Sequence, residues 1–319
     1  MLNLLLLVLA AVTTIDTSTA LAQTYPTRPV RVIVPLAPGG GSDITARQFA
    51  SKLSEALGQQ FVIDNRGGAG GLIGIEIAAK SVADGYTLLM VGGGYAATAA
   101  LQKNGEEAIR ALVPVVEFGI TPFVLSVHPA VPVKTTRELI ALARAKPNQL
   151  TYASAGIGGI THLATELFAR DAAIKLIHVP YKSTGAAMTD LLSGQVPVIV
   201  GSLLPMVPYI EARRMRPLGV TTAKRWYSLP DIPALAEVLP GYDVELAFGT
   251  LAPRGTPQTV IDTVNAAVNT ALMQVDMKKN LEAQGMAGTG GPQQRYVERI
   301  RRDFDKWSKL VREANIRAE

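Results

Sequence analysis

The feature that most constrains the fold of this chain is a strand that runs directly into glycines and then into a helix, and it occurs twice. Residues 30–43 read VRVIVPLAPGGGSD, and residues 150–161 read LTYASAGIGGIT. Glycine allows positive φ and lets backbone N–H groups approach a ligand, while the N-terminus of the next helix adds unpaired N–H donors and the positive end of its dipole. Each junction therefore predicts an anion-binding loop, and together they predict two half-sites that meet across a cleft.

Apolar runs of strand length alternate with amphipathic helical runs along most of the chain, which is typical of a largely parallel sheet covered by helices. With 319 residues, the chain is long enough for about two domains. We expect it to leave the first lobe near Phe123 and to return near Ala247, and two crossings imply a hinge that closes around a ligand. The sequence thus predicts an α/β protein with residues 23–122 and 247–319 in lobe 1 and residues 123–246 in lobe 2.

Within this frame, each element is expected from its apolar periodicity and its end signals. Lobe 1 is expected to hold a helix over 43–57, capped by Ser42 and ended by Gly58, strands over 61–63 and 86–91, and a glycine-rich loop over 65–74 that opens a helix to about 80. Residues 113–127 hold two β-rich runs. Lobe 2 is expected to hold helices over 138–145, 162–169 and 184–192, the last capped by Thr184, and strands over 150–153, 176–179, 196–200 and 218–220. Helices over 258–272 and 293–314 are expected to pack back on lobe 1.

The first 22 residues differ from the rest of the chain. Residues 4–12 form an apolar core of signal-peptide length, and Ala20-Leu21-Ala22 fits a small-x-small cleavage site, although no Lys or Arg precedes the apolar core. The alternative of a membrane anchor requires about 20 apolar residues, far more than are present. We therefore predict a signal peptide over 1–22, cleavage after Ala22, and export to the periplasm.

Composition narrows the chemistry. The chain contains no cysteine, which excludes disulfides, thiolate nucleophiles and cysteine-ligated metals. A net charge of +5 suits attraction of anionic solutes but is too mild to indicate nucleic-acid binding. Basic residues over 295–312 alternate with apolar ones at helical spacing, which favours the solvent face of a terminal helix over a polyanion site.

Catalytic and cofactor motifs are not assembled in this sequence. It has no G-x-S-x-G elbow, no H-E-x-x-H pair, no Walker loop and no G-x-G-x-x-G, and we predict neither enzyme activity nor a cofactor. The three histidines are far apart in the sequence; His128 and His178 are expected to be structural. His162 opens the helix after the second glycine loop, so it is a candidate ligand contact.

Three further residues beside the glycine runs are candidates for the site. Asp43 would repel a carboxylate, so we expect it to accept backbone N–H bonds at the helix start or to orient a bridging water. Tyr95 and Tyr181 each follow a strand end, where either ring could line the cleft or pack in the core.

Several motifs resemble one known family. They are YPTRPVRVIVPLAPGGGSD, FVIDNRGGAGGLIG, DGYTLLM, LTYASAGIGG with THLATELF, HVPYKSTGAAMTDLLSGQV and LAPRGTP. Together they resemble the Bug-type, TctC-like extracytoplasmic solute receptors of tripartite tricarboxylate transporters. The resemblance implies a type II periplasmic-binding-protein fold that delivers carboxylates to membrane permease subunits. It also implies that residues 36–43 and 154–161 hold a ligand carboxylate, partly through ordered waters.

Two segments depart from the family pattern. Residues 92–115 are abbreviated, and residues 201–204 lack the acidic or amide residue that is frequent there, which suggests a shorter or less polar ligand tail. The expected protein is a monomeric receptor for a small carboxylate; the alternatives are a receptor that signals to a sensor kinase, or an enzyme acting on an anionic substrate. The predicted ligand-binding residues are Leu36, Ala37, Pro38, Gly39, Gly40, Gly41, Ser42, Asp43, Tyr95, Ser154, Gly156, Ile157, Gly158, Gly159, Thr161, His162, Tyr181 and Ser202.

Overall fold

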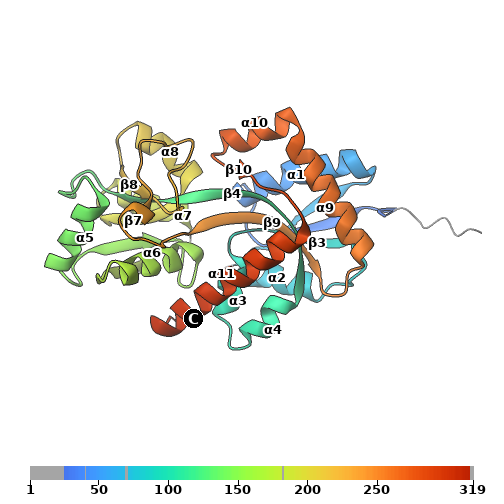
Figure 1. Ribbon diagram of the computed structural model, residues 1–319, viewed down its shortest axis with the longest axis horizontal. Coiled ribbons are helices and arrows are strands. Elements are labelled where there is room, and N and C mark those ends of the chain that lie inside the picture. Colours follow the sequence, from blue (N-terminus) through green and yellow to red (C-terminus); the bar gives the residue numbers. More distant parts are fainter. Residues whose placement is uncertain (1–24, 40, 69–70, 182, 317–319) are drawn as a thin grey trace, which may run out of the picture.

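The computed structural model describes residues 25–39, 41–68, 71–181 and 183–316 and contains two α/β lobes (Figure 1). The expected signal peptide, residues 1–22, lies outside these residues. The strands are β1 (Val30–Val34), β2 (Phe61–Asn65), β3 (Thr87–Gly92), β4 (Leu112–Val127), β5 (Thr151–Ser154), β6 (Ile177–Pro180), β7 (Val198–Ser202), β8 (Arg216–Val220), β9 (Glu245–Pro253) and β10 (Ala287–Gly288). The α-helices are α1 (Gly41–Leu57), α2 (Leu72–Ala79), α3 (Tyr95–Ala100), α4 (Gly105–Arg110), α5 (Thr136–Ala145), α6 (Ile160–Asp171), α7 (Thr184–Leu192), α8 (Leu203–Glu211), α9 (Gln258–Met273), α10 (Val275–Ala283) and α11 (Gln293–Glu313).

The strands follow the order β2-β1-β3-β9-β4-β7-β5-β6, and β8 and β10 pair with β4. Lobe 1 contains the parallel set β2-β1-β3, and lobe 2 contains the parallel set β7-β5-β6. The predicted α/β fold with two lobes is therefore confirmed.

Two strands connect the lobes. β4 and β9 pair antiparallel from Leu112 opposite Pro253 to Pro122 opposite Glu245, and β4 then continues from Phe123 alongside β7 in lobe 2. The proposed lobe boundaries at 122/123 and 246/247 fall within these two strands and remain a proposal. The two β-rich runs expected over 113–127 are one strand, because β4 continues through two irregularities in its pairing with β9 near Pro114 and Gly119.

Both faces of the sheet are buried, as parallel strands require. In β1, Val32 packs with Phe49 on one face, while Ile33 belongs to a cluster on the opposite face. That second cluster extends through both lobes and includes Tyr152 of β5. On the first face each lobe has its own cluster, so the two lobes share a continuous apolar core on one side only.

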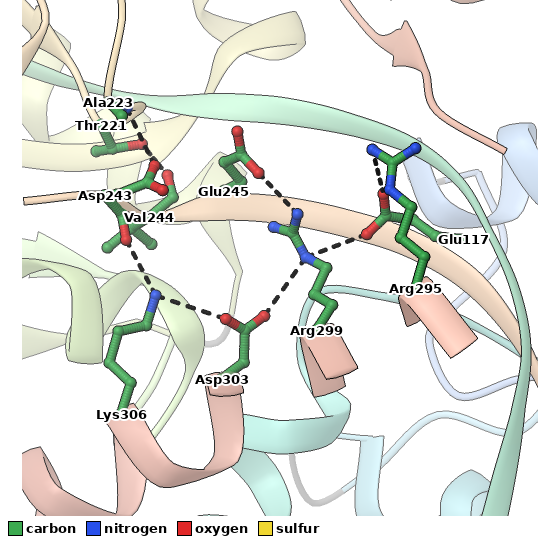
Figure 2. A network of polar contacts seen from close by, with 10 residues as sticks. All are labelled: Glu117, Thr221, Ala223, Asp243, Val244, Glu245, Arg295, Arg299, Asp303 and Lys306. Atoms are coloured by element: carbon green, nitrogen blue, oxygen red, sulfur yellow. Dashed lines mark hydrogen bonds and ion pairs between the residues drawn. The ribbon is translucent and has the colours of Figure 1, made fainter. Parts of the chain in front are cut away.

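The helix α11 lies on the side of the shared core. Its buried side chains recur every three or four residues, which makes one apolar stripe: Tyr296, Ile300, Phe304, Trp307 and Leu310. The helix contacts α3 and β4 in lobe 1 and α6 in lobe 2, and Figure 1 shows it crossing obliquely from the shared strands toward lobe 2. The expectation that its basic residues face solvent is wrong for Arg299, whose side chain is only 12% exposed within a cluster of carboxylates (Figure 2).

Several predicted details of the helices differ from the structure. Ser42 is not the cap of α1, because the helix already begins at Gly41, and the cap of α7 is Ser183 rather than Thr184. Gly58 follows the end of α1 with φ near 70°, as expected for a helix stop. The helices α3, α4, α8 and α10 were not predicted. Among the described helices, none combines the length and apolar character that a membrane span requires.

Candidate functional site

The first glycine loop connects β1 to α1 and is held by Asp43. This buried carboxylate accepts hydrogen bonds from Gly39 N–H, Arg47 Nε and Asn65 Nδ2, each at 3.0 Å. Burial by itself would raise the pKa of Asp43, but these hydrogen bonds and the Arg47 charge outweigh it and lower the pKa. The expectation that Asp43 accepts a backbone N–H is confirmed, and Asn65 also donates to Leu36 O at 3.1 Å.

This arrangement changes which groups of the first loop are available to a ligand. Gly39 N–H is already bound to Asp43, so it is not the free donor that we expected. Among the described residues, the N–H groups of Ser42 and Asp43 in the first turn of α1 have no protein partner, as is usual for helix N-termini. The Ser42 hydroxyl has no hydrogen bond within the described part of the chain and lies close to Gly92 at the end of β3.

The remaining predicted residues of this loop are Leu36, Ala37, Pro38, Gly40 and Gly41. Leu36, Ala37 and Pro38 are exposed, with Leu36 at 42%. Gly41 is the first residue of α1. Gly40 lies outside the described residues, so its predicted role is unaddressed.

The second glycine loop, residues 154–159, connects β5 to α6 and makes most of its hydrogen bonds internally. These bonds are Gly156 N–H to Ser154 Oγ (3.2 Å), Gly158 N–H to His162 Nδ1 (2.9 Å), Gly159 N–H to Gly156 O (3.2 Å) and Ala155 N–H to Thr161 Oγ1 (3.0 Å). The N–H groups of Gly156, Gly158 and Gly159, which were predicted to bind the ligand, therefore have partners within the protein, and the Ser154 hydroxyl is engaged as well. The Thr161 hydroxyl accepts the Ala155 N–H and keeps its own proton as a donor.

The groups of the second loop that stay available are different ones. Within the described residues, the N–H groups of Ile157, Thr161 and His162 have no partner. Gly159 is the N-cap of α6 and provides no side chain to cap it, which leaves the first turn unpaired. Ile157 is 38% exposed. The second loop therefore offers a ligand the N–H group of Ile157 and the N–H groups of the first turn of α6, and not a row of glycine N–H groups.

The three other predicted residues lie in different surroundings. Tyr95 is 2% exposed, and its hydroxyl donates to Ala108 O and Ile109 O, so it packs in the core. Tyr181 lies beside the second loop, where its N–H donates to Ser154 O while its hydroxyl donates to Asp190. Ser202 ends β7 and precedes α8, at the same end of the lobe 2 sheet as the second loop.

Segments of the two lobes touch near these loops. An ideal Cβ built on Gly158 would lie 2.5 Å from Leu101 Cδ1, so the segment that follows α3 in lobe 1 rests on the second glycine loop. A second contact involves the turn between α10 and β10, where Gly285 O accepts from Thr121 Oγ1 at 3.1 Å and from Trp226 Nε1 at 2.9 Å. In both lobes the glycine loops follow the carboxyl ends of parallel strands, where α/β proteins bind ligands.

Sequence reasoning missed the residues that hold the loops in place. Asn65 stands at the start of the conspicuous NRGG segment, which was a usable signal. His178, expected to be a structural histidine in an apolar strand, is half-buried with its Nε2 2.6 Å from Ser154 Oγ. Its ring stacks on that of His162, a contact between β6 and α6 that no local pattern predicts. Within the described ranges, no group of His, Asp and Glu side chains is arranged to hold a metal ion.

The stacked histidines make the stability of the fold sensitive to acid. Burial lowers the pKa of both His162 and His178 to about 4, and the neighbouring His178 contributes to the shift at His162. In the unfolded chain both would titrate near 6.5, so between these values the unfolded state binds protons that the folded state does not. Stability is therefore full above pH 6.5 and falls as the pH is lowered toward 4.

Urea unfolding at a series of pH values measures this dependence. The double variant His162→Asn/His178→Gln removes both titrating groups, and we expect its free energy of unfolding to fall less steeply between pH 6.5 and 5 than that of the wild type. Equal slopes for the two proteins would contradict the prediction.

Two α/β lobes joined by two shared strands, with glycine loops at the carboxyl ends of parallel strands in each lobe, define a two-lobed solute-binding protein. Residues 45–316 match the family described as "Tripartite tricarboxylate transporter family receptor". The chain belongs to this family of periplasmic solute-binding receptors, which confirms the resemblance seen in its motifs.

Individual relatives agree with this assignment. The chain is 33% identical to protein BugT of Bordetella pertussis over 302 residues, which cover 93% of this chain and 92% of BugT. The solved structure of R. palustris Rpa4515 with adipate is 36% identical, with a TM-score of 0.82, and the match covers 92% of this chain and 99% of that one. MatC from Rhodopseudomonas palustris with bound malate is 29% identical, with a TM-score of 0.79, and the match covers 90% of this chain and 100% of that one.

Proposed function

We propose that this chain is exported by a cleavable signal peptide, captures a small carboxylate in the periplasm and delivers it to the permease subunits of a tripartite tricarboxylate-type transporter. The observation that carries the proposal is the pair of helix N-termini, at α1 in lobe 1 and α6 in lobe 2, whose first-turn N–H groups have no partner among the described residues. Such groups favour an anion through hydrogen bonds and through the helix dipole. Adipate and malate, which occupy two solved relatives, are both small dicarboxylates.

In this proposal the two lobes share one carboxylate group. The first turn of α1 supplies the N–H groups of Ser42 and Asp43 and the Ser42 hydroxyl, and lobe 2 supplies the N–H groups of Ile157 and Thr161. The negative charge of Asp43 is already compensated by Arg47 and by two hydrogen bonds, which reduces its repulsion of the ligand. Bridging waters extend the reach of these donors where the direct distance is too long.

The rest of the ligand is expected to be largely hydrocarbon. Leu36 and Ile157 expose apolar side chains beside the two loops, at 42% and 38%. In the 201–204 segment, Ser202 is the one polar side chain. We therefore expect a ligand with an apolar tail to bind more tightly than citrate, whose second half carries further charges.

We propose that the receptor acts as a monomer, because both half-sites come from a single chain. We also propose that it does not transform its ligand. The hinge formed by β4 and β9 allows the lobes to close on the ligand. A sensor kinase that reads the closed shape is the alternative partner. Loss of labelled-ligand uptake in a deletion strain would support the permease, whereas normal uptake with loss of a transcriptional response would support the sensor.

A ligand screen tests the proposal. The chain without residues 1–22 is unfolded thermally in the presence of linear mono- and dicarboxylates of increasing length, citrate, phosphate and a neutral amino acid. A ligand present at 100 times its Kd adds about 2.7 kcal/mol to the stability, so a binder is visible as a rise in Tm. We expect at least one carboxylate with an apolar tail to raise Tm, with titration calorimetry giving one site per chain. A rise with phosphate or the amino acid only would contradict the proposal.

A further inference from the structure

Three rings from three elements are stacked directly behind the second glycine loop. The rings of His162 from α6 and His178 from β6 have centroids 3.9 Å apart and are inclined by 6°. The ring of Tyr152 from β5 continues the stack, with its centroid 4.9 Å from that of His178. Tyr152 and His178 are direct neighbours in the parallel pairing of β5 and β6, so the sheet register itself brings these two rings together.

Each histidine binds the loop through one ring nitrogen. His162 Nδ1 accepts the N–H of Gly158 at 2.9 Å, and His178 Nε2 lies 2.6 Å from Ser154 Oγ, which accepts the N–H of Gly156 at 3.2 Å. Gly156 and Gly158 are the loop residues with positive φ, at 130° and 71°. His162 therefore holds Gly158 directly, and His178 holds Gly156 through the Ser154 hydroxyl; these are the two glycines whose conformation gives the loop its shape.

The surroundings of the pair favour neutral rings. Acceptance at Nδ1 places the His162 proton on Nε2, which lies 4.0 Å from Glu166 Oε1. That carboxylate already accepts the hydroxyl proton of Tyr152. The groups that face the histidines are thus Tyr152 and Ser154 from β5, Glu166 from α6, and the other histidine. Two stacked rings at 3.9 Å cannot both carry a positive charge without strong repulsion.

We propose that His162 and His178 are positioning residues of the ligand site. The neutral Nδ1 of His162 occupies the Gly158 N–H, and the Nε2 of His178 holds the Ser154 hydroxyl, which in turn occupies the Gly156 N–H. This leaves Ile157 N–H and the first turn of α6 for the ligand. The inference rests on the proposed function and replaces the expectation that His162 contacts the ligand itself. Protonation of His162 converts Nδ1 from an acceptor to a donor, so the Gly158 N–H loses its partner and the loop loses its shape.

The chain offers a matched set of variants to test this. In His162→Asn, the amide oxygen takes the place of Nδ1, whereas His162→Leu has no acceptor; His178→Gln and His178→Leu form the same pair for Nε2. His128 is the control, because its Nδ1 also accepts a loop N–H, that of Ala130 at 3.2 Å, at the other end of lobe 2. We expect His162→Leu to raise the Kd of the best-binding carboxylate about tenfold or more, His162→Asn to stay within about threefold, and His128→Leu to leave Kd unchanged.

The pH profile separates positioning from direct attraction. At each pH, the affinity of the wild type is divided by the affinity of His162→Asn. Ionisation of the ligand affects both affinities equally, so it does not change this ratio. We expect this ratio to fall as the pH is lowered from 6.5 toward 4, because protonation disrupts the loop. A ring that attracted the anion directly would make the ratio rise, and that result would overturn the proposal.

A measurement without ligand tests positioning even if no carboxylate binds. Amide hydrogen exchange at Gly158, followed by NMR, is expected to be about tenfold or more faster in His162→Leu than in the wild type, and close to the wild-type rate in His162→Asn. Unchanged exchange in His162→Leu would overturn the proposal. Failure of the wild type to bind any carboxylate would instead overturn the proposed function, since the exchange result does not depend on it.

Discussion

Replacing Arg299 with methionine is expected to lower the free energy of unfolding by about 4 kcal/mol, because it leaves buried carboxylates without their cation. The guanidinium lies 3.1 Å from Glu117 Oε2, 2.8 Å from Glu245 Oε2 and 3.6 Å from Asp303 Oδ2. Glu117 is 2% exposed, and its next cation, Arg295, is 4.0 Å away (Figure 2). Burial by itself would lower the pKa of Arg299, but the three carboxylates raise it, so the side chain stays charged.

The position of this cluster explains why the effect should be large. Glu117 belongs to β4 and Glu245 to β9, the two strands that connect the lobes, while Arg299 and Asp303 belong to α11. The arginine thus ties the terminal helix to both shared strands. Nearby, Lys306 Nζ donates to Asp243 O at 3.0 Å, just before β9 (Figure 2).

Urea unfolding followed by circular dichroism measures the loss. Arg302→Met is the matched control, because Arg302 is an exposed arginine on the same helix, and we expect a change within about 0.5 kcal/mol. The double variant Arg299→Met/Glu117→Gln should recover part of the loss, since the most buried charge is removed together with its partner. A loss below about 1 kcal/mol in Arg299→Met would show that the cluster contributes little.

Replacing Gly158 with valine is expected to weaken carboxylate binding about 100-fold or more. The residue has φ near 71°, which a β-branched side chain adopts only with strain, and its Cβ would lie 2.5 Å from Leu101 Cδ1. The strain at positive φ acts on the loop backbone itself, and the contact with the Leu101 side chain adds to it, so we expect the loop to move together with the N–H groups of Ile157 and of the first turn of α6. A 100-fold loss corresponds to about 2.7 kcal/mol of binding free energy.

A matched glycine separates the loss of binding from general destabilisation. Gly241 also has positive φ, at 89°, but an added Cβ would have nothing within 4 Å. Gly241→Val should lower Tm and leave Kd unchanged, whereas Gly158→Val should change both. In the Leu101→Ala/Gly158→Val variant the steric overlap is relieved, and we expect part of the affinity to return. Calorimetric Kd values within threefold of wild type for Gly158→Val would refute the assignment of this loop.

Local patterns were sufficient for the elements that carry a strong period or a clear end signal. The predicted limits 43–57, 258–272 and 293–314 differ by at most two residues from α1, α9 and α11, because each combines a regular apolar stripe with a glycine or proline near one end. The short helices α3 and α4 were missed because six residues provide too few turns for a periodic signal. A third helix, α8, was missed because it contains Pro205 and Pro208, and proline is unfavourable inside a helix.

The candidate site was located by its glycines, but the bonding of those glycines was not predictable. Positive φ at Gly156 and Gly158 follows from local sequence, yet their N–H groups are taken by Ser154 and His162, and the latter bond depends on how α6 starts. The stacking of His162 on His178 depends on the register of β5 with β6. The burial of Arg299 likewise depends on carboxylates from β4 and β9, which are distant in sequence.

A crystal structure of the chain with the tightest-binding carboxylate from the screen tests the central claim most directly. We expect one carboxylate group to lie within hydrogen-bond reach, directly or through one water, of Ser42 in the first turn of α1 and of Ile157 and the first turn of α6. The Gly158 N–H should still be bound to His162 in that complex. A ligand bound to one lobe alone, or held by groups outside these two helix N-termini, would contradict the account.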